Sequence, residues 1–328
     1  MWAQVYGKPV PWQSPENVSV SEMQSEVTRP VLRYHGGKWR TAKWILQYFP
    51  PHRVYVEPYG GAGSVLMQKP RTYAEVYNDL DSEVVNVFRV LRDPEKMVEL
   101  RWLLWNTPFS REEFILAFDP CDYPVEQARR TILKSYAGFG SDSIHRGKKI
   151  GMRTRPSPWG QSSQWGPPGF RSIPSTHRAD TGFRADSNRS GTTPAKDWAS
   201  YPDSLIDFCE RLRGVVIENR PALKVIPQYD YPDTLFYVDP PYVSSTRRDA
   251  RHGYLHDFVD RDHVELAKVL HEVKGMVVLS AYHSPLYEEL YRGWKRVESE
   301  FLVHGSAKAT EVLWLSGNVS PRQLECFE

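Results

Sequence analysis

Short apolar segments recur along most of the chain and alternate with longer segments in which apolar residues repeat every three or four positions. The short segments have the length of strands, and several are apolar throughout, as in a parallel sheet covered on both faces. They predict strands at residues 53–57, 73–77, 215–218, 235–238, 276–280 and 312–315. The alternation predicts an α/β fold with a mostly parallel sheet.

Segments with helical periodicity separate these strands. The first two strands enclose a loop and a short helix, which together form a βαβ unit. A long run of helices then follows, and the strands resume only after residue 213. Predicted helices begin near residue 64 and lie at 82–92, 94–105, 111–118, 124–136, 202–213, 260–272 and 285–292. The sheet is therefore split in the sequence by a helical insertion.

Two segments show neither the pattern of strands nor the periodicity of helices. Residues 1–29 are polar and contain three prolines, so we expect an N-terminal arm. Residues 141–200 hold seven glycines, six prolines, ten serines and five threonines, and regular structure is not expected there. The same window carries ten lysines or arginines against four aspartates, interleaved with aromatic residues such as Trp159 and Trp165. This mixture fits either a surface that contacts nucleic acid or a solvated linker.

Composition narrows the class of protein. The 328 residues include 42 basic and 40 acidic side chains, a net charge of +2, so any surface for a polyanion must be local. Cys121, Cys209 and Cys326 lie far apart without a CxxC pair, which argues against a zinc module and a disulfide framework. No apolar run reaches the ~20 residues of a membrane span, and residues 1–29 lack a signal-peptide core. We expect a soluble, intracellular protein.

A glycine-rich loop follows the first predicted strand. It has the sequence EPYGGAG at residues 57–63 and leads into a helix, where the backbone can approach a ligand that carries a carboxylate. Its spacing is not the GxGxxG fingerprint of dinucleotide enzymes, and a simple tight turn is the alternative. Asp79 ends the second strand and is placed either to accept hydrogen bonds from ribose hydroxyls or to cap the next helix.

The segment Asp239-Pro240-Pro241-Tyr242 is the sharpest motif, because it follows an apolar strand at the end where open α/β sheets bind ligands. The two prolines fix φ and remove two backbone donors. The Asp239 carboxylate and the Pro240 carbonyl are then both acceptors, which fits a ligand group with two N–H bonds, such as an exocyclic amine. Tyr242 supplies a ring face. A rigid loop that ends a strand is the alternative interpretation.

Several motifs in a fixed order resemble the Dam-like, D12-class DNA adenine-N6 methyltransferases. The resemblance extends from about residue 31 to residue 315. It rests on GGK at 36–38, EPYGGAGSV at 57–65, NDLD at 78–81, DPPY at 239–242, and Tyr254, Phe258, Asp262, His263 and Leu266. It implies a Rossmann-like S-adenosylmethionine-dependent methyltransferase sheet with an inserted target recognition domain.

The resemblance also implies domains and site residues. The arm would be 1–29, the catalytic domain 30–93 with 202–328, and the recognition insertion 94–201. The S-adenosylmethionine site would be lined by Tyr34, Gly37, Lys38, Glu57, Tyr59, Gly61, Gly63 and Asp79. The catalytic residues would be Asp239, Pro240, Pro241 and Tyr242. The candidate DNA contacts are Lys134, Arg153, Arg155, Arg184, Arg247, Arg248 and Arg251.

The implied reaction moves a methyl group to N6 of an adenine flipped out of double-stranded DNA at a specific site. Asp239 and the Pro240 carbonyl would accept both N–H bonds and direct the nitrogen lone pair at the methyl donor, with no metal. Flipping costs a few kcal/mol, and stacking on Tyr242 returns about 1–3 kcal/mol, so phosphate contacts must contribute the rest.

Other functions use the same features. The pocket fits an RNA adenine or a protein amide as acceptor, and a nucleic-acid-binding module without chemistry is a further class. Asp239 before the prolines and the basic aromatic insertion favour DNA. The stretch KSYAGFG at 134–140 differs from the one with which Dam reads its site, and TGFR at 181–184 resembles phage-borne members. We expect a monomer or weak dimer in the cytoplasm of a bacterial or phage-infected cell.

Overall fold

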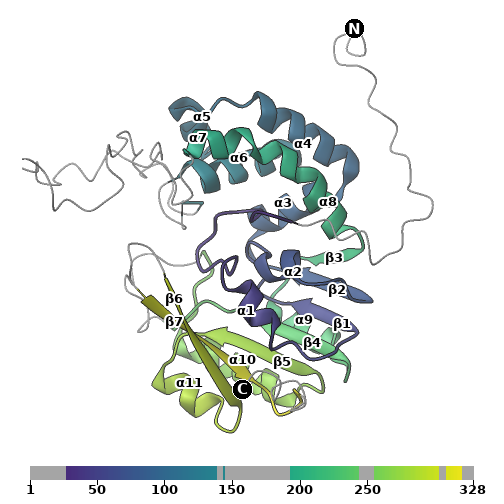
Figure 1. The fold of residues 1–328 in the computed structure, drawn as a ribbon, viewed down its shortest axis with the longest axis vertical. Coiled ribbons are helices and arrows are strands. Elements are labelled where there is room, and N and C mark those ends of the chain that lie inside the picture. Colours follow the sequence, from purple (N-terminus) through teal and green to yellow (C-terminus); the bar gives the residue numbers. More distant parts are fainter. Residues whose placement is uncertain (1–26, 139–142, 145–192, 244–254, 303–307, 320–328) are drawn as a thin grey trace, which may run out of the picture.

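The computed structural model describes residues 27–138, 143–144, 193–243, 255–302 and 308–319, and a mixed seven-stranded sheet lies at its centre (Figure 1). The strand order is β3-β2-β1-β4-β5-β7-β6. The first five of these strands are parallel, and β7 runs antiparallel to both β5 and β6. The strands are β1 Val54–Glu57, β2 Ala74–Asn78, β3 Val215–Glu218, β4 Thr234–Val238, β5 Met276–Ala281, β6 Lys295–Leu302 and β7 Lys308–Leu315.

Helices cover both faces of this sheet. Figure 1 shows α4 to α8 gathered at one end of the molecule, past β3, with β6 and β7 at the other end. The helices are α1 Ala42–Leu46, α2 Ser64–Gln68, α3 Ser82–Arg92, α4 Pro94–Asn106, α5 Arg111–Leu116, α6 Pro124–Ala137, α7 Pro194–Ala199, α8 Leu205–Leu212, α9 Ala222–Gln228, α10 Asp260–Glu272 and α11 Pro285–Leu290. A 3-10 helix, Tyr201–Ser204, joins α7 to α8. Within the described ranges, none of the helices has the length and apolar character needed to cross a bilayer.

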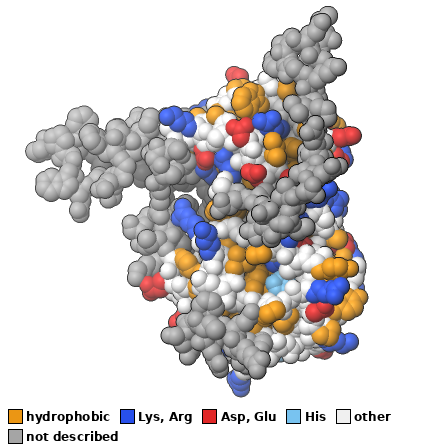
Figure 2. All heavy atoms as spheres, turned by 45° about the vertical axis from the view of Figure 1, so that its right-hand side comes forward, with side chains coloured by type: hydrophobic (Ala, Val, Ile, Leu, Met, Phe, Trp, Pro, Cys, Tyr) orange, Lys and Arg blue, Asp and Glu red, His pale blue; other side chains and the backbone are white. Residues whose placement is uncertain are grey.

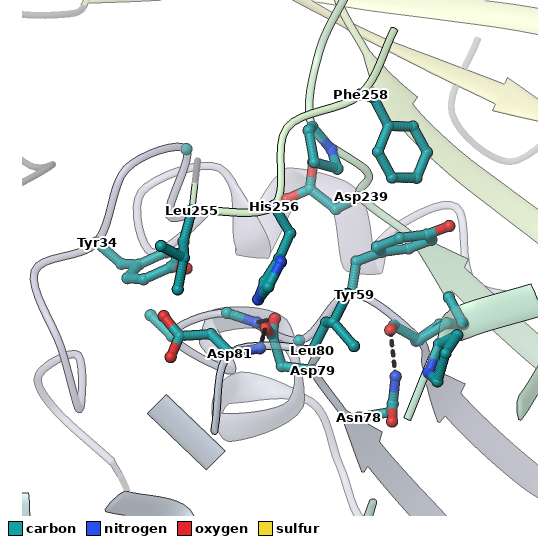
Figure 3. Close-up of a pocket in the computed structure, with 18 of the residues that line it drawn as sticks. Tyr34, Tyr59, Asn78, Asp79, Leu80, Asp81, Asp239, Leu255, His256 and Phe258 are labelled. Carbon is teal, nitrogen blue, oxygen red and sulfur yellow. Dashed lines mark hydrogen bonds between the residues drawn. The ribbon is translucent and has the colours of Figure 1, made fainter. Parts of the chain in front are cut away.

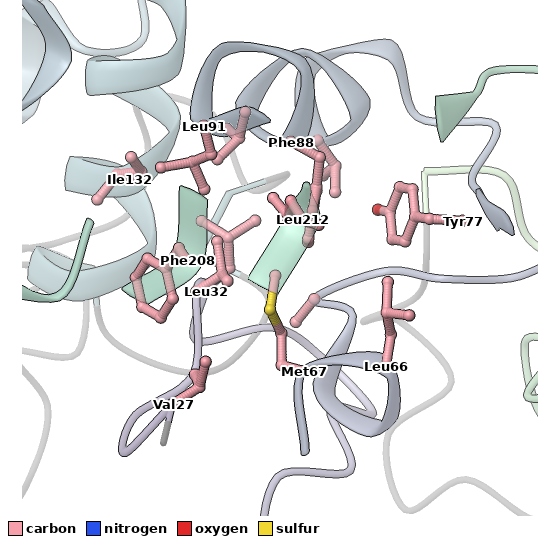
Figure 4. Packing of buried hydrophobic residues seen from close by; sticks show 14 of the residues in the cluster. Val27, Leu32, Leu66, Met67, Tyr77, Phe88, Leu91, Ile132, Phe208 and Leu212 are labelled. Atoms are coloured by element: carbon pink, nitrogen blue, oxygen red, sulfur yellow. The ribbon is translucent and has the colours of Figure 1, made fainter. Parts of the chain in front are cut away.

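The strands are buried on both faces because successive side chains pack into two different cores. In β4, Leu235 and Tyr237 join a core under α1, α2, α3 and α8, whereas Phe236 and Val238 join a core under α9, α10 and α11. The first core continues past β3 into the helical end of the molecule (Figure 4). The predicted recognition helices α4 to α6 therefore share apolar packing with the catalytic core, and the predicted domain limits stay a prediction.

The predicted α/β fold and each predicted strand are confirmed, and the structure adds four elements. β6 was missed because four of its eight residues are charged, a composition typical of polar surface and of an edge strand. The short α1 and α9 were missed because they are too brief to show a helical period, and α9 also contains Pro227. The expectation that residues 141–200 lack regular structure was wrong for α7, which Thr193 caps and whose Trp198 is buried.

Candidate active site

A cavity of about 220 Å³ opens where the predicted motifs meet, at the carboxyl ends of the parallel strands (Figure 3). β1, β2 and β4 lie side by side in the sheet, so the loops that follow them share one edge. The described residues that line the cavity include Tyr34, Gly37, Tyr59, Gly61, Asp79, Asp239 and Pro241. These predicted site residues, far apart in the sequence, are brought together by the sheet.

The glycine loop between β1 and α2 runs tightly over Tyr77. Gly61 and Gly63 have φ values of +48° and +60°, in the left-handed region that favours glycine. A Cβ at Gly60 would lie 2.2 Å from Cε2 of Tyr77, so a side chain does not fit there. The Tyr77 hydroxyl donates to the Gly61 carbonyl at 2.6 Å. These contacts hold the loop backbone at the wall of the cavity.

Asp79 fixes the same loop from the end of β2. Its Oδ2 accepts from the Gly61 N–H and its Oδ1 from the Asp81 N–H, both at 2.8 Å. Burial raises the pKa of Asp79 to about 6, although these backbone hydrogen bonds act in the opposite direction. The cap of α3 is Asp81, which accepts from the N–H groups of Glu83 and Val84. The Asp79 side chain therefore does not cap α3, and it lines the cavity.

Asn78 is part of the NDLD motif, but the sequence analysis gave it no role at the site. Its side-chain amide donates to the carbonyls of Pro58 and Arg220 at 2.8 and 3.0 Å, and its Oδ1 accepts from the Arg220 N–H at 3.0 Å. It thus ties the glycine loop to the loop after β3. Arg220 and Pro221 of that loop and Leu223 at the start of α9 line the cavity as well. Their only sequence signal was a position directly after a predicted strand.

Asp239 forms an ion pair with Lys38 at the floor of the site. The Lys38 Nζ lies 2.9 Å from Oδ1 and 2.8 Å from Oδ2 of Asp239, and it also donates to the Gly36 carbonyl at 2.7 Å. Burial raises the pKa of Asp239, the Lys38 ammonium lowers it and the Glu311 carboxylate raises it, and the pKa is about 6. At neutral pH this carboxyl group is therefore an ionised acceptor beside the cavity.

Tyr242 lies deeper than Asp239. Its ring is 5% exposed, and its hydroxyl donates to Oε1 of Glu311 and lies 3.2 Å from Oγ of Ser280. Among the described residues, the cavity lining does not include Tyr242 or Pro240. The Tyr242 ring therefore braces the Asp239 loop here, and its role as a stacking surface stays a prediction.

Three predicted cofactor residues lie behind the cavity wall. Lys38, Glu57 and Gly63 are outside the lining that the described residues form. The Glu57 carboxylate accepts from the Leu66 N–H and the Tyr55 hydroxyl, both at 3.2 Å, and burial raises its pKa to about 8. Glu57 thus anchors the start of α2 to the end of β1. Its contact with a cofactor stays a prediction.

Aromatic side chains form the two ends of the cavity. In Figure 3, Tyr34 and Leu255 lie at one end, Tyr59 and Phe258 at the other, and His256 reaches toward Asp79. The Tyr59 and Phe258 rings pack edge to face with their centroids 5.7 Å apart. Such rings provide flat apolar walls for a ligand that carries a heterocycle.

One predicted DNA contact lies in the described part of the chain. Lys134 is on α6, where its side chain is 7% exposed and its Nζ lies 2.7 Å from Oε2 of Glu83. This ion pair competes with a phosphate for the Lys134 ammonium. The other six candidates, Arg153, Arg155, Arg184, Arg247, Arg248 and Arg251, lie outside the described residues. On the described surface in Figure 2, basic and acidic side chains are interspersed with apolar ones.

Comparison with known proteins agrees with this geometry. The family model of the D12 class N6 adenine-specific DNA methyltransferases matches residues 34–137 and 184–304. A type II methyltransferase, M1.LlaDCHI, of Lactococcus lactis subsp. cremoris is 24% identical over 297 residues, 86% of this chain and 91% of that protein. A DNA adenine methylase of Serratia marcescens is 26% identical over 110 residues, 33% of this chain and 40% of that protein. With a matched region that holds the glycine loop, Asp79 and Asp239, the chain belongs to the D12 class N6 adenine-specific DNA methyltransferase family.

Proposed function

We propose that the chain transfers the methyl group of S-adenosylmethionine to N6 of an adenine flipped out of double-stranded DNA, at a specific sequence. One observation carries the proposal. The Asp79-bound glycine loop and the Asp239 carboxylate lie on the same cavity, at the carboxyl ends of adjacent parallel strands. The proposed site for the nucleoside-like methyl donor therefore adjoins the proposed site for the amine that receives the methyl group.

The lining residues fit S-adenosylmethionine. Asp79 offers a carboxylate to ribose hydroxyls, and the glycine-loop backbone lies beside it. Tyr34 and Tyr59 add aromatic walls, which favour the sulfonium charge through cation–π attraction. The apolar side chains of Pro221 and Leu223 complete a wall for the adenine ring. S-adenosylmethionine, when bound, supplies the electrophilic methyl group.

Asp239 provides the acceptor chemistry on the DNA side. The lone pair of an adenine N6 is delocalised into the ring, so the amine is a weak nucleophile. An ionised Asp239 accepts one N–H bond, and the Pro240 carbonyl is the proposed acceptor of the other, which localises the lone pair. The Lys38 ion pair holds the Asp239 carboxylate in one orientation before the base arrives.

The remaining parts of the proposal concern the DNA contacts, the biological role, the location and the oligomeric state. The basic, aromatic segment 145–192 is proposed to contact phosphates and set the sequence preference. Lys134 and the six arginines outside the described residues stay candidate contacts. A role in restriction-modification, a phage-borne origin, a cytoplasmic location and a monomeric or weakly dimeric state are proposals of the same kind.

The decisive experiment replaces Asp239 by alanine. We expect Asp239→Ala to lower methyl transfer by at least about a thousandfold, because an acceptor that acts in the transition state is lost. The readouts are transfer of labelled methyl groups to DNA from cells that lack adenine methylation, and calorimetric binding of S-adenosylmethionine. Binding should be retained. Asp203→Ala, which removes an exposed carboxylate in the helical end, is the matched control.

Two results would contradict the proposal. If Asp239→Ala loses cofactor affinity as severely as activity, Asp239 belongs to the cofactor site. If the wild-type chain labels RNA or protein and leaves DNA unlabelled, the proposed substrate is wrong.

A further inference from the structure

A buried carboxylate stands behind the Asp239 loop, on β7. Glu311 is 7% exposed, and its Oε1 accepts hydrogen bonds from the Tyr242 hydroxyl and, at 2.5 Å, from Oγ of Ser280. The same oxygen lies 4.0 Å from the Lys38 Nζ. Burying a carboxylate is costly unless donors and a cation compensate it. Here all of the compensating groups belong to or adjoin the proposed active site.

The network links the site to three separate elements. Ser280 belongs to β5, Tyr242 follows β4, and Lys38 lies in the loop before α1. The Lys38 ammonium is shared, because it contacts the Asp239 carboxylate and also lies 4.8 Å from the centroid of the Tyr242 ring. Glu311 is therefore one contact removed from Asp239, through Lys38 on one side and through Tyr242 on the other.

Resting on the proposed function, we propose that Glu311 is a positioning residue for methyl transfer. It fixes the Tyr242 ring and the Lys38 ammonium behind Asp239, and it contacts neither the adenine nor the cofactor. Glu311 lies beyond the residues 34–137 and 184–304 that match the family model, so its role is assigned from the geometry of this chain.

The direction of the hydrogen bonds explains how Glu311 holds Tyr242. An ionised carboxylate only accepts, so the Tyr242 hydroxyl donates to it, and turning away would lose this charge-assisted hydrogen bond in a buried place. Tyr282 packs against the Tyr242 ring with an interplanar angle of 70° and a centroid separation of 4.5 Å. The ring plane is thus defined at its tip by Glu311 and at its side by Tyr282.

Charge gives Glu311 a second effect that can be measured. Among the described residues, the titratable groups that act on the Asp239 carboxylate come from the loop before α1, from β1, from β4 and its loop, from α11 and from β7. They are Lys38, Glu57, Tyr237, Tyr242, Tyr287 and Glu311. Of these, the Glu311 carboxylate shares Lys38 with Asp239 and raises the pKa of Asp239. Removing the Glu311 charge leaves the ammonium to act on Asp239 more fully.

The test is Glu311→Gln, which keeps the size and an acceptor oxygen but removes the charge. We expect kcat on unmethylated plasmid DNA to fall about tenfold, in line with a weakened charge-assisted hydrogen bond, with S-adenosylmethionine affinity unchanged. We also expect the pH below which kcat/KM declines to move to a lower value, because the pKa of Asp239 falls. Glu298→Gln, an exposed residue on the neighbouring β6, is the matched control and should match the wild type in both readouts.

The outcomes separate the two proposals. An active wild type with Glu311→Gln equal to it in kcat and in pH profile overturns the role of Glu311 alone. Equal losses of cofactor affinity and kcat overturn it too, because they indicate a general structural defect. If Glu311→Gln does not fold, Tyr242→Phe decides, since it keeps the ring but removes its tether, and wild-type kcat in that variant refutes the inference. A wild type that methylates no DNA refutes the proposed function itself.

Discussion

The Asp239 carboxyl group is subject to opposing influences that set the pH range of the proposed reaction. Burial and the Glu311 carboxylate raise its pKa and the Lys38 ammonium lowers it, which leaves the pKa at about 6. Asp239 must be ionised to accept an N–H bond from adenine. Activity should therefore be full above this pKa and decline as the pH falls through it, by about tenfold per pH unit at the lower end.

Lys38→Met tests this balance in the direction opposite to the Glu311 variant. Without the ammonium, the main influence that opposes burial and Glu311 is lost, so the pKa of Asp239 rises and the decline of kcat/KM moves to higher pH. The measurement is the pH profile of methyl transfer, compared between the wild type and the variant. Lys43→Met, an exposed lysine on α1, is the control with the same chemical change. A decline that stays in place, or moves to lower pH, would show that Lys38 does not govern Asp239.

At the scale of elements, the glycine loop between β1 and α2 is tightly constrained by the Tyr77 ring. We expect Gly60→Ala to lower the free energy of unfolding by about 1–3 kcal/mol, because its Cβ would overlap the Tyr77 ring and force the loop or the ring to move. Cofactor affinity should fall together with stability, since the loop lines the cavity.

Gly317→Ala serves as the control for this substitution. No heavy atom lies within 4 Å of the position that a Cβ would take at Gly317, so its alanine variant should have the same free energy of unfolding as the wild type. Denaturant unfolding and calorimetric titration of S-adenosylmethionine measure both effects. Gly60→Ala with unaltered stability and affinity would mean that the loop tolerates a shifted backbone.

The elements also show how far the sequence could predict the site. The apolar segment 235–238 and the two prolines after it placed Asp239 at the cavity edge, because strand polarity and φ restriction are local properties. The role of Glu311 could not be predicted in this way. It is a single charged residue before the predicted strand at 312–315, and the sequence does not indicate which residues it contacts. The ion pair of Lys38 with Asp239 was missed for the same reason, because it joins residues from two distant loops.

At the scale of the whole molecule, α7 explains where the predicted insertion can be cut. Asp197 of α7 forms ion pairs with Arg29 and Arg33, and Nε1 of Trp198 donates to the Thr107 carbonyl at 2.9 Å. The Tyr201 hydroxyl, just after α7, donates to the Val31 carbonyl. A deletion of residues 141–200 would remove α7 and loosen the segment that leads into Tyr34.

Replacing only residues 145–192 by a glycine-serine linker should leave a folded core. We expect S-adenosylmethionine affinity to be retained, and affinity for DNA at low salt to fall by at least about tenfold, because several basic side chains are lost. Calorimetry and fluorescence anisotropy at two salt concentrations measure the two affinities. Unchanged DNA affinity with an unchanged salt dependence would refute the role of the segment.

The junction at α6 and α7 has an evolutionary consequence. α6 ends at Ala137, α7 begins at Pro194, and the two helices contact each other, while Ile144 between them belongs to the core. If the segment 145–192 sets the sequence preference, as proposed, recombination between relatives could exchange that segment and keep the methyl-transfer site. Related enzymes would then differ in target sequence and share the same methyl-transfer chemistry.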